Sequence, residues 1–234
     1  EKIENLQEYQ YGYHKGWSMI LDTLTWPVLI MMLICIGIAP IFAGEYQSKC
    51  DSLILCMKYG RSKLILAKII SGWLYATGVY WGITLIYSSI YMIFLGTQGA
   101  DLPIQLKYPA MSVGYNLTMG EAVGITLLLG YFFTLGIMGI TLFMSALLKN
   151  TYAVIIVAFL LIIIPTFLSL DTGGYVWSHV LSLLPPKIAD FSFQSYTAYS
   201  IGNIVVMAIL VNAIVAVLCS VLGYIIFRKH QVNK

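Results

Sequence analysis

Five long apolar runs, separated by shorter polar segments, constrain what this chain can fold into more than any other feature. The runs cover residues 26–43, 69–95, 119–148, 152–170 and 201–227. A helix of about 20 residues is long enough to cross the hydrocarbon core of a bilayer. The sequence therefore predicts an all-α polytopic membrane protein with five transmembrane helices.

The composition excludes several other classes of protein. Only 10% of the 234 residues are charged, whereas soluble domains carry about 25% charged residues. The sequence has no cluster of basic and aromatic residues of the kind that binds nucleic acid, so we expect no nucleic-acid partner. The four cysteines and three histidines have no ligand spacing, so we expect reduced cysteines and no metal site. No phosphate-binding glycine loop, nucleophile elbow or zinc-protease motif is present, so we expect a non-enzymatic subunit without its own cofactor.

The distribution of basic residues predicts the orientation in the membrane. Cytoplasmic loops carry an excess of lysine and arginine, and residues 44–68 carry five of the thirteen. If this segment is cytoplasmic, its side of the membrane holds Lys49, Lys58, Arg61, Lys63, Lys68, Lys149, Arg228, Lys229 and Lys234. The other side then holds only Lys2, Lys15, Lys107 and Lys187. We therefore expect a multi-pass protein of the cell membrane, the plasma membrane of a bacterium, with a cytoplasmic C-terminus.

This orientation places the N-terminal residues outside, although they do not form a signal peptide. The simplest explanation is one further span upstream, which makes six in the intact subunit. Residues 1–25 then form an outer interfacial segment, because aromatic residues such as Tyr9, Tyr13 and Trp17 favour the headgroup layer. Residues 26–234 form the transmembrane domain.

The basic segment between the first two runs has the spacing of a short surface helix over residues 44–59. Apolar positions recur along one side of this helix, at Tyr46, Cys50, Leu53 and Met57. Glu45 precedes Lys49 by four residues, the order that favours a helical ion pair. Gly60 is a natural C-terminal stop for this helix.

The residues alone leave three functions open for this segment. The helix could lie on anionic headgroups, to which its basic residues are attracted. The segment could also be a solvated loop. Alternatively, the apolar stripe could dock into a groove on a cytoplasmic partner.

The same segment resembles the first cytoplasmic loop of type-2 ABC exporter permeases. In that family a glutamate at the end of a membrane helix opens the loop, and a small coupling helix follows. A turn ending in Gly-Arg or Pro-x-Arg comes next, and Gly-Lys or Ala-Lys marks the following membrane helix. The matching positions here are Glu45, Gly60, Arg61, Ala67 and Lys68. This chain departs from the family pattern by lacking the common Gly-Thr after the glutamate and the proline before the arginine.

The resemblance implies a permease domain over residues 26–234, with a cytoplasmic coupling loop over 44–68. It also implies two permease subunits, as a homodimer or heterodimer in the lipid bilayer, and separate ATP-binding-cassette ATPase subunits that hold ATP and Mg²⁺. The residues expected to dock on the ATPase are Glu45, Lys49, Asp51, Leu53, Met57, Lys58, Tyr59, Gly60 and Arg61. The substrate stays open among peptides, lipids, drugs and polysaccharides.

Two rival functions follow from the same sequence. The first is a permease-like scaffold or sensor that moves nothing, for example in antibiotic resistance or signalling. The second is a membrane enzyme or proton-coupled carrier. We rank it last, because such proteins place ionisable residues deep in their spans and the apolar runs of this chain have almost none. Glu121, near the start of the third run, is the one candidate for a substrate contact, although a first helical turn also favours a negative charge.

Overall fold

The computed structural model describes residues 12–23, 27–50, 56–57, 60–107, 117–167 and 201–229. In this part of the chain all regular elements are helical, apart from one isolated bridge between Pro103 and Thr118. The α-helices are α1 (Lys15–Thr23), α2 (Pro27–Ile38), α3 (Pro40–Gln47), α5 (Ile65–Leu95), α6 (Met119–Leu147), α7 (Thr151–Phe167) and α9 (Ile201–Lys229). A π-helical turn (Gly60–Leu64) leads into α5, and a 3₁₀ turn (Ile104–Leu106) lies between α5 and α6.

Four of the described helical segments are long and apolar enough to cross a membrane. They are Val28–Gln47, which joins α2 and α3, Ser62–Leu95, Met119–Leu147 and Ile209–Lys229. The apolar helix Thr151–Ile164, within α7, is shorter. The chain is thus a helical membrane protein. Four of the five predicted runs overlap these four segments, and the run over residues 152–170 overlaps the shorter helix.

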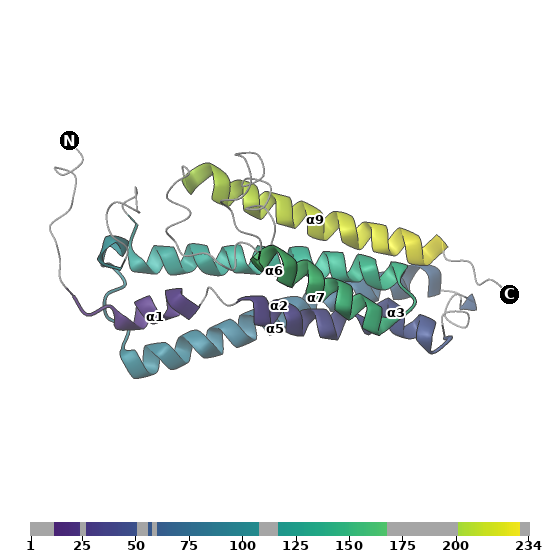
Figure 1. Cartoon of the computed structure of the whole chain (residues 1–234), viewed down its shortest axis with the longest axis horizontal. Coiled ribbons are helices and arrows are strands. Elements are labelled where there is room, and N and C mark those ends of the chain that lie inside the picture. The colour runs from purple at the N-terminus through teal and green to yellow at the C-terminus, as the bar shows by residue number, and fades with distance from the viewer. Residues whose placement is uncertain are drawn as a thin grey trace.

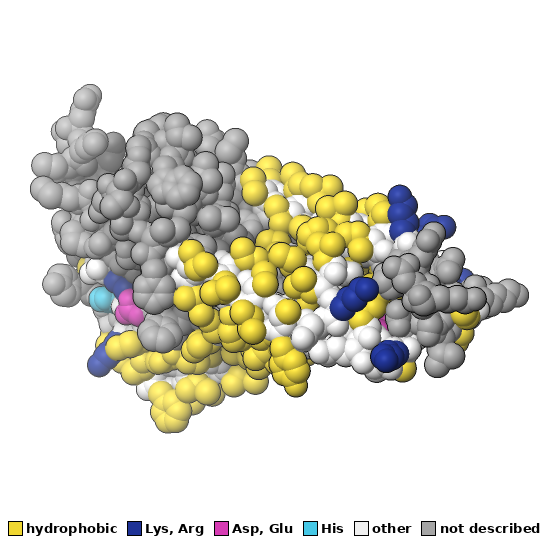
Figure 2. All heavy atoms as spheres, turned by 45° about the vertical axis from the view of Figure 1, so that its right-hand side comes forward, with side chains coloured by type: hydrophobic (Ala, Val, Ile, Leu, Met, Phe, Trp, Pro, Cys, Tyr) yellow, Lys and Arg dark blue, Asp and Glu magenta, His cyan; other side chains and the backbone are white. Residues whose placement is uncertain are grey.

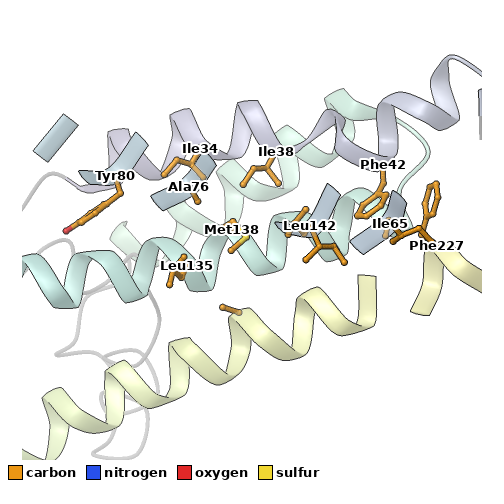
Figure 3. Close-up of a cluster of buried hydrophobic side chains, with 13 residues drawn as sticks. Ile34, Ile38, Phe42, Ile65, Ala76, Tyr80, Leu135, Met138, Leu142 and Phe227 are labelled. Carbon is orange, nitrogen blue, oxygen red and sulfur yellow. The ribbon is translucent and has the colours of Figure 1, made fainter. Parts of the chain in front are cut away.

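Helix α6 lies at the centre of the bundle, with α9 along one side and α2, α3 and α5 along the other (Figure 1). One buried cluster joins α2, α3, α5, α6 and α9, and Figure 3 shows its side chains along α6. A second cluster joins α2, α6 and α7. Both clusters draw on α6, so packing against this helix holds the bundle together.

Helices α6 and α9 run parallel and approach closely at two glycines of α6. A Cβ atom on Gly136 would lie 2.7 Å from the Asn212 side-chain oxygen, and one on Gly139 would lie 2.7 Å from the Cα atom of Ala216. Helices in a bilayer associate through close packing, because lipid gives them no hydrophobic driving force. These glycines therefore set the distance between the two helices.

The structure contradicts the predicted start of the helix over residues 44–59, whereas Cys56 is helical and residues 51–55 and 58–59 lie outside the described part of the chain. Helix α3 carries the membrane span on through Glu45 to Gln47, and the chain leaves the helix at Ser48. Lys49 has φ 55°, and the Ser48 hydroxyl donates hydrogen bonds to the carbonyls of Gly44 and Glu45. The helix ends here because a serine occupies its last carbonyls and a left-handed residue follows.

The expectation for Gly60 is also wrong, because Gly60 begins the π-helical turn that leads into α5. Glu45 forms an ion pair with Lys68 of α5, and Lys49 lies beyond the end of α3.

We expect Gly139→Ala to destabilise the bundle by about 1–3 kcal/mol, because the new methyl group overlaps the backbone of α9. Gly124→Ala in the same helix is the matched control, since its Cβ would meet nothing within 4 Å. We expect this control to hold or raise stability. The measurement is the midpoint of unfolding by sodium dodecyl sulfate in mixed micelles, and equal midpoints for the two variants would contradict the close α6–α9 contact.

Candidate functional site

The two ends of the bundle differ in charge, as Figure 2 shows. One end contains the ends of α3, α6 and α9 and the beginnings of α5 and α7, and we call it the basic end. Its described charges are Lys49, Lys63, Lys68, Lys149, Arg228 and Lys229, with Glu45. The described charges of the opposite end are Lys15, Lys107, Asp22, Asp101 and Glu121. Among the described residues, the excess of positive charge thus lies at the end that the sequence analysis expects to be cytoplasmic.

An ion pair between Glu45 of α3 and Lys68 of α5 lies inside the basic end. The Lys68 side chain is 22% exposed and that of Glu45 is 15% exposed. The Lys68 ammonium also donates a hydrogen bond of 3.0 Å to the Ile41 carbonyl. The pair joins residues that are 23 positions apart, so it holds together the two ends of the segment that contains the basic loop.

Aromatic side chains surround this pair on the side facing the bundle. The Lys68 ammonium lies 5.7 Å from the centroid of the Phe42 ring. Phe42 packs on Phe227 of α9 at 4.7 Å between ring centroids, and Tyr46 packs on Phe227 at 5.5 Å. Figure 3 shows Phe42 and Phe227 close to Ile65, near the first turn of α5. An ion pair bordered by aromatic rings is shielded from water, which strengthens the attraction between its charges.

A break between α2 and α3 lies one turn before this pair. Pro40 has no N–H to bond the carbonyl of Ile36, and the regular helix is interrupted at Ala39. The buried Ser145 hydroxyl of α6 accepts hydrogen bonds from the Phe42 and Ala43 N–H groups, at 3.1 and 3.0 Å. It donates one of 2.7 Å to the Ala39 carbonyl. A hydroxyl from a neighbouring helix thus bonds three of the backbone groups around the break, in a medium where water cannot do so.

The end of α3 is also tied to the connector between α6 and α7. The Gln47 side-chain amide donates to the Asn150 side-chain oxygen at 2.9 Å and accepts from the Thr151 hydroxyl at 2.8 Å. The Tyr46 hydroxyl donates to the Ala146 carbonyl at 3.2 Å. A displacement of α3 therefore acts on α5, α6, α7 and α9 together.

The structure places the predicted docking residues unevenly. Glu45 is at the base of the loop, Lys49 is exposed at its first turn, and Gly60 is buried at its return. Met57 is exposed by 53%. Only the backbone of Arg61 is described, in the π-helical turn. Four predicted residues lie outside the described part of the chain: Asp51, Leu53, Lys58 and Tyr59.

Glu121 has a structural role at the opposite end. It accepts a hydrogen bond of 3.0 Å from the Thr118 N–H, and the Thr118 hydroxyl accepts one of 3.2 Å from the Glu121 N–H. This capping box satisfies two backbone donors at the start of α6. The exposed side chain of Glu121 is therefore used to begin a helix.

A second ion pair anchors α1 at the opposite end. The Lys107 ammonium lies 2.7 Å from an Asp22 carboxylate oxygen and also bonds the Ser18 carbonyl. Burial lowers the pKa of Lys107, while its hydrogen bond to Asp22 and the charge of that carboxylate act in the opposite direction. The described residues of neither end include a group of three or more His, Cys, Asp or Glu that could hold a metal ion.

Sequence reasoning missed the partners that build the basic end. Ser145 and Phe227 lie in apolar runs far from the loop, and nothing in their local sequence signals a contact with α3. Lys68 is the exception, since the Ala-Lys pattern at the start of the second span marks it.

Comparison with known proteins identifies a family and nothing more specific. The family described as "Protein of unknown function (DUF2705)" matches residues 6–232, so the chain belongs to this family. No curated protein and no solved structure matches the chain.

We expect the Glu45–Lys68 pair to stabilise the bundle through mutual coupling. Glu45→Gln and Lys68→Gln each leave one charge without its partner, which costs about 1–3 kcal/mol for a shielded pair. The double variant should cost less than the sum of the two. The same micelle unfolding assay measures all three, with exposed Lys149→Gln as a control expected within about 0.5 kcal/mol of the original chain. Additive losses would show that the two side chains do not interact.

We also expect Ser145→Ala to destabilise the chain by about 1–3 kcal/mol, because three backbone groups at the Pro40 break lose their partner. Ser71→Ala is the matched control, since the exposed Ser71 hydroxyl bonds only to the Lys68 carbonyl in its own helix. A loss for Ser145→Ala no larger than that of the control would refute the bridging role of Ser145.

Proposed function

We propose that this DUF2705 protein is the membrane permease subunit of a type-2 ABC exporter. The observation that carries the proposal is the Glu45–Lys68 ion pair. Both residues match positions of the permease loop pattern, one before the loop and one after it. In the structure the two matched residues contact each other across 23 positions. This contact gives both of them a role at the base of the loop, which is what supports the proposal.

In this proposal the basic end faces the cytoplasm and the loop after α3 docks on a separate ATP-binding-cassette ATPase. The ATPase holds ATP and Mg²⁺, and two permease subunits complete the exporter. Met57 supports docking, because an apolar side chain exposed by 53% fits a protein groove better than water.

The contacts of α3 explain how movement of the loop would reach the membrane helices. The Glu45–Lys68 pair joins α3 to α5, and Gln47 joins α3 to the α6–α7 connector. The break at Ala39 gives α3 a place to bend relative to α2. If ATP favours one position of the loop over another, this set of contacts shifts the population of bundle conformations.

The first test is whether the tagged chain, extracted from its own host membranes in mild detergent, retains an ATPase. We expect a polypeptide with an ATP-binding cassette to copurify with the original chain. Met57→Asp should reduce its recovery by about tenfold or more, as the loss of a central contact does. Tyr13→Asp is the matched control, because Tyr13 is also exposed by 53% but lies at the opposite end. Mass spectrometry identifies and quantifies the partner.

Two results would contradict the proposal. One is the absence of any ATP-binding-cassette protein from the purified complex. The other is equal recovery with Met57→Asp and with the original chain. Recovery of the ATPase without ATP-dependent export from reconstituted vesicles would instead identify the permease-like scaffold.

A further inference from the structure

The basic end carries exposed cations whose positions the helix dipoles explain only in part. These cations are Lys49, Lys63, Lys149, Arg228 and Lys229. All but Lys63 lie at or just after the C-terminal end of a helix, where a positive charge is favourable. Lys63 lies in the π-helical turn that begins the α5 span, where a positive charge is unfavourable. Lys63 interacts within the protein, and its side chain is nevertheless exposed at the surface.

Lys63 and Arg228 lie at the same level on two neighbouring helices. The Trp73 indole N–H of α5 donates a hydrogen bond of 3.1 Å to the Ser220 hydroxyl of α9. From this contact Lys63 is ten residues along α5 and Arg228 is eight along α9, or about 15 and 12 Å at the helical rise. Ile65 and Phe227 belong to the same buried cluster, and Figure 3 shows them close together at this end.

An apolar surface lies below these two cations, along the seam between α5 and α9. On α5, the exposed residues Leu66, Ile70 and Leu74 follow Lys63 at helical spacing. On α9, the exposed residues Val217 and Val221 share one side of the helix with Arg228. The Arg228 guanidinium lies 6.0 Å from the Tyr224 ring centroid, a contact that restrains it beside the seam.

We propose that this seam binds an anionic phospholipid, with its phosphate between Lys63 and Arg228 and its acyl chains along α5 and α9. A phospholipid combines a negative headgroup and an apolar tail in the same order as the cations and apolar residues of the seam. The apolar residues lie within two spans, so hydrocarbon is the medium that contacts them. A soluble protein could satisfy the cations but not this surface. The proposal does not depend on the function proposed above.

Native mass spectrometry of the full chain in mild detergent tests the proposal. We expect phosphatidylglycerol to bind about tenfold more tightly than phosphatidylcholine with the same acyl chains, as two cations near an anionic headgroup allow. The double variant Lys63→Gln/Arg228→Gln should bind both lipids equally. Lys149→Gln is the matched control at the same end, because Asn150 beside it is bonded to α3 and not to the seam. We expect this control to keep the preference.

Each other result overturns the proposal. Equal binding of the two lipids by the original chain removes the headgroup site. An equal loss of preference in Lys149→Gln shows a diffuse charge effect and no defined seam. Binding of free glycerol 3-phosphate as tightly as phosphatidylglycerol shows a phosphate site that needs no acyl chain. Retention of the preference in the double variant places the lipid elsewhere.

Discussion

Pro40 removes a backbone donor from a helix that runs through an apolar medium, and the architecture of the basic end follows from the repair of that break. Water cannot satisfy the freed groups at this depth, so the partner has to come from the protein. The Ser145 hydroxyl is such a partner for three groups beside the break, since it accepts from two N–H groups and donates to the Ala39 carbonyl. This arrangement fixes α3 against α6. The ring of Phe42 then packs on α9, and Glu45 comes within reach of Lys68.

The charges of Glu45 and Lys68 need stabilising contacts, because both side chains are largely buried in a membrane protein. Transfer of an isolated carboxylate or ammonium from water is costly, and a pair offsets this cost only with good geometry and further hydrogen bonds. Lys68 has a second acceptor in the Ile41 carbonyl and an aromatic ring at Phe42. Because breaking such a pair leaves a charge exposed to an apolar medium, the pair favours a bundle in which α3 and α5 move together. A loop joined at its base in this way moves the two helices as a unit.

The sequence predicted where the long apolar helices lie, and it failed where a residue's partner lies far away in the chain. Hydropathy places the third span at 119–148, and α6 covers Met119–Leu147, because the apolar character of a span is a local property. The predicted start of the surface helix over 44–59 was wrong for the opposite reason. Tyr46 fits an amphipathic stripe in sequence, yet its ring packs on Phe227 and its hydroxyl bonds the Ala146 carbonyl. No local pattern reveals that α9 and α6 supply these partners, so the helix that ends at Gln47 could not be told from one that begins at Gly44.

The cations of the basic end divide into two groups by what lies beneath them, and this division bears on both proposals. Lys68 lies over the interior of the bundle, where its charge is matched by Glu45 and its position is fixed by α3. Lys63 and Arg228 lie over an apolar surface that faces away from the core. In the two proposals, a movement of the loop acts on Lys68 through Glu45, whereas a change in the lipids of the bilayer acts on Lys63 and Arg228. Lys63 and Lys68, one from each group, are five residues apart in the chain, or about one and a half helical turns. A rotation of α5 that strains the Glu45–Lys68 pair would therefore also carry Lys63 relative to Arg228, so a lipid held at the seam would resist that rotation and stabilise the paired arrangement.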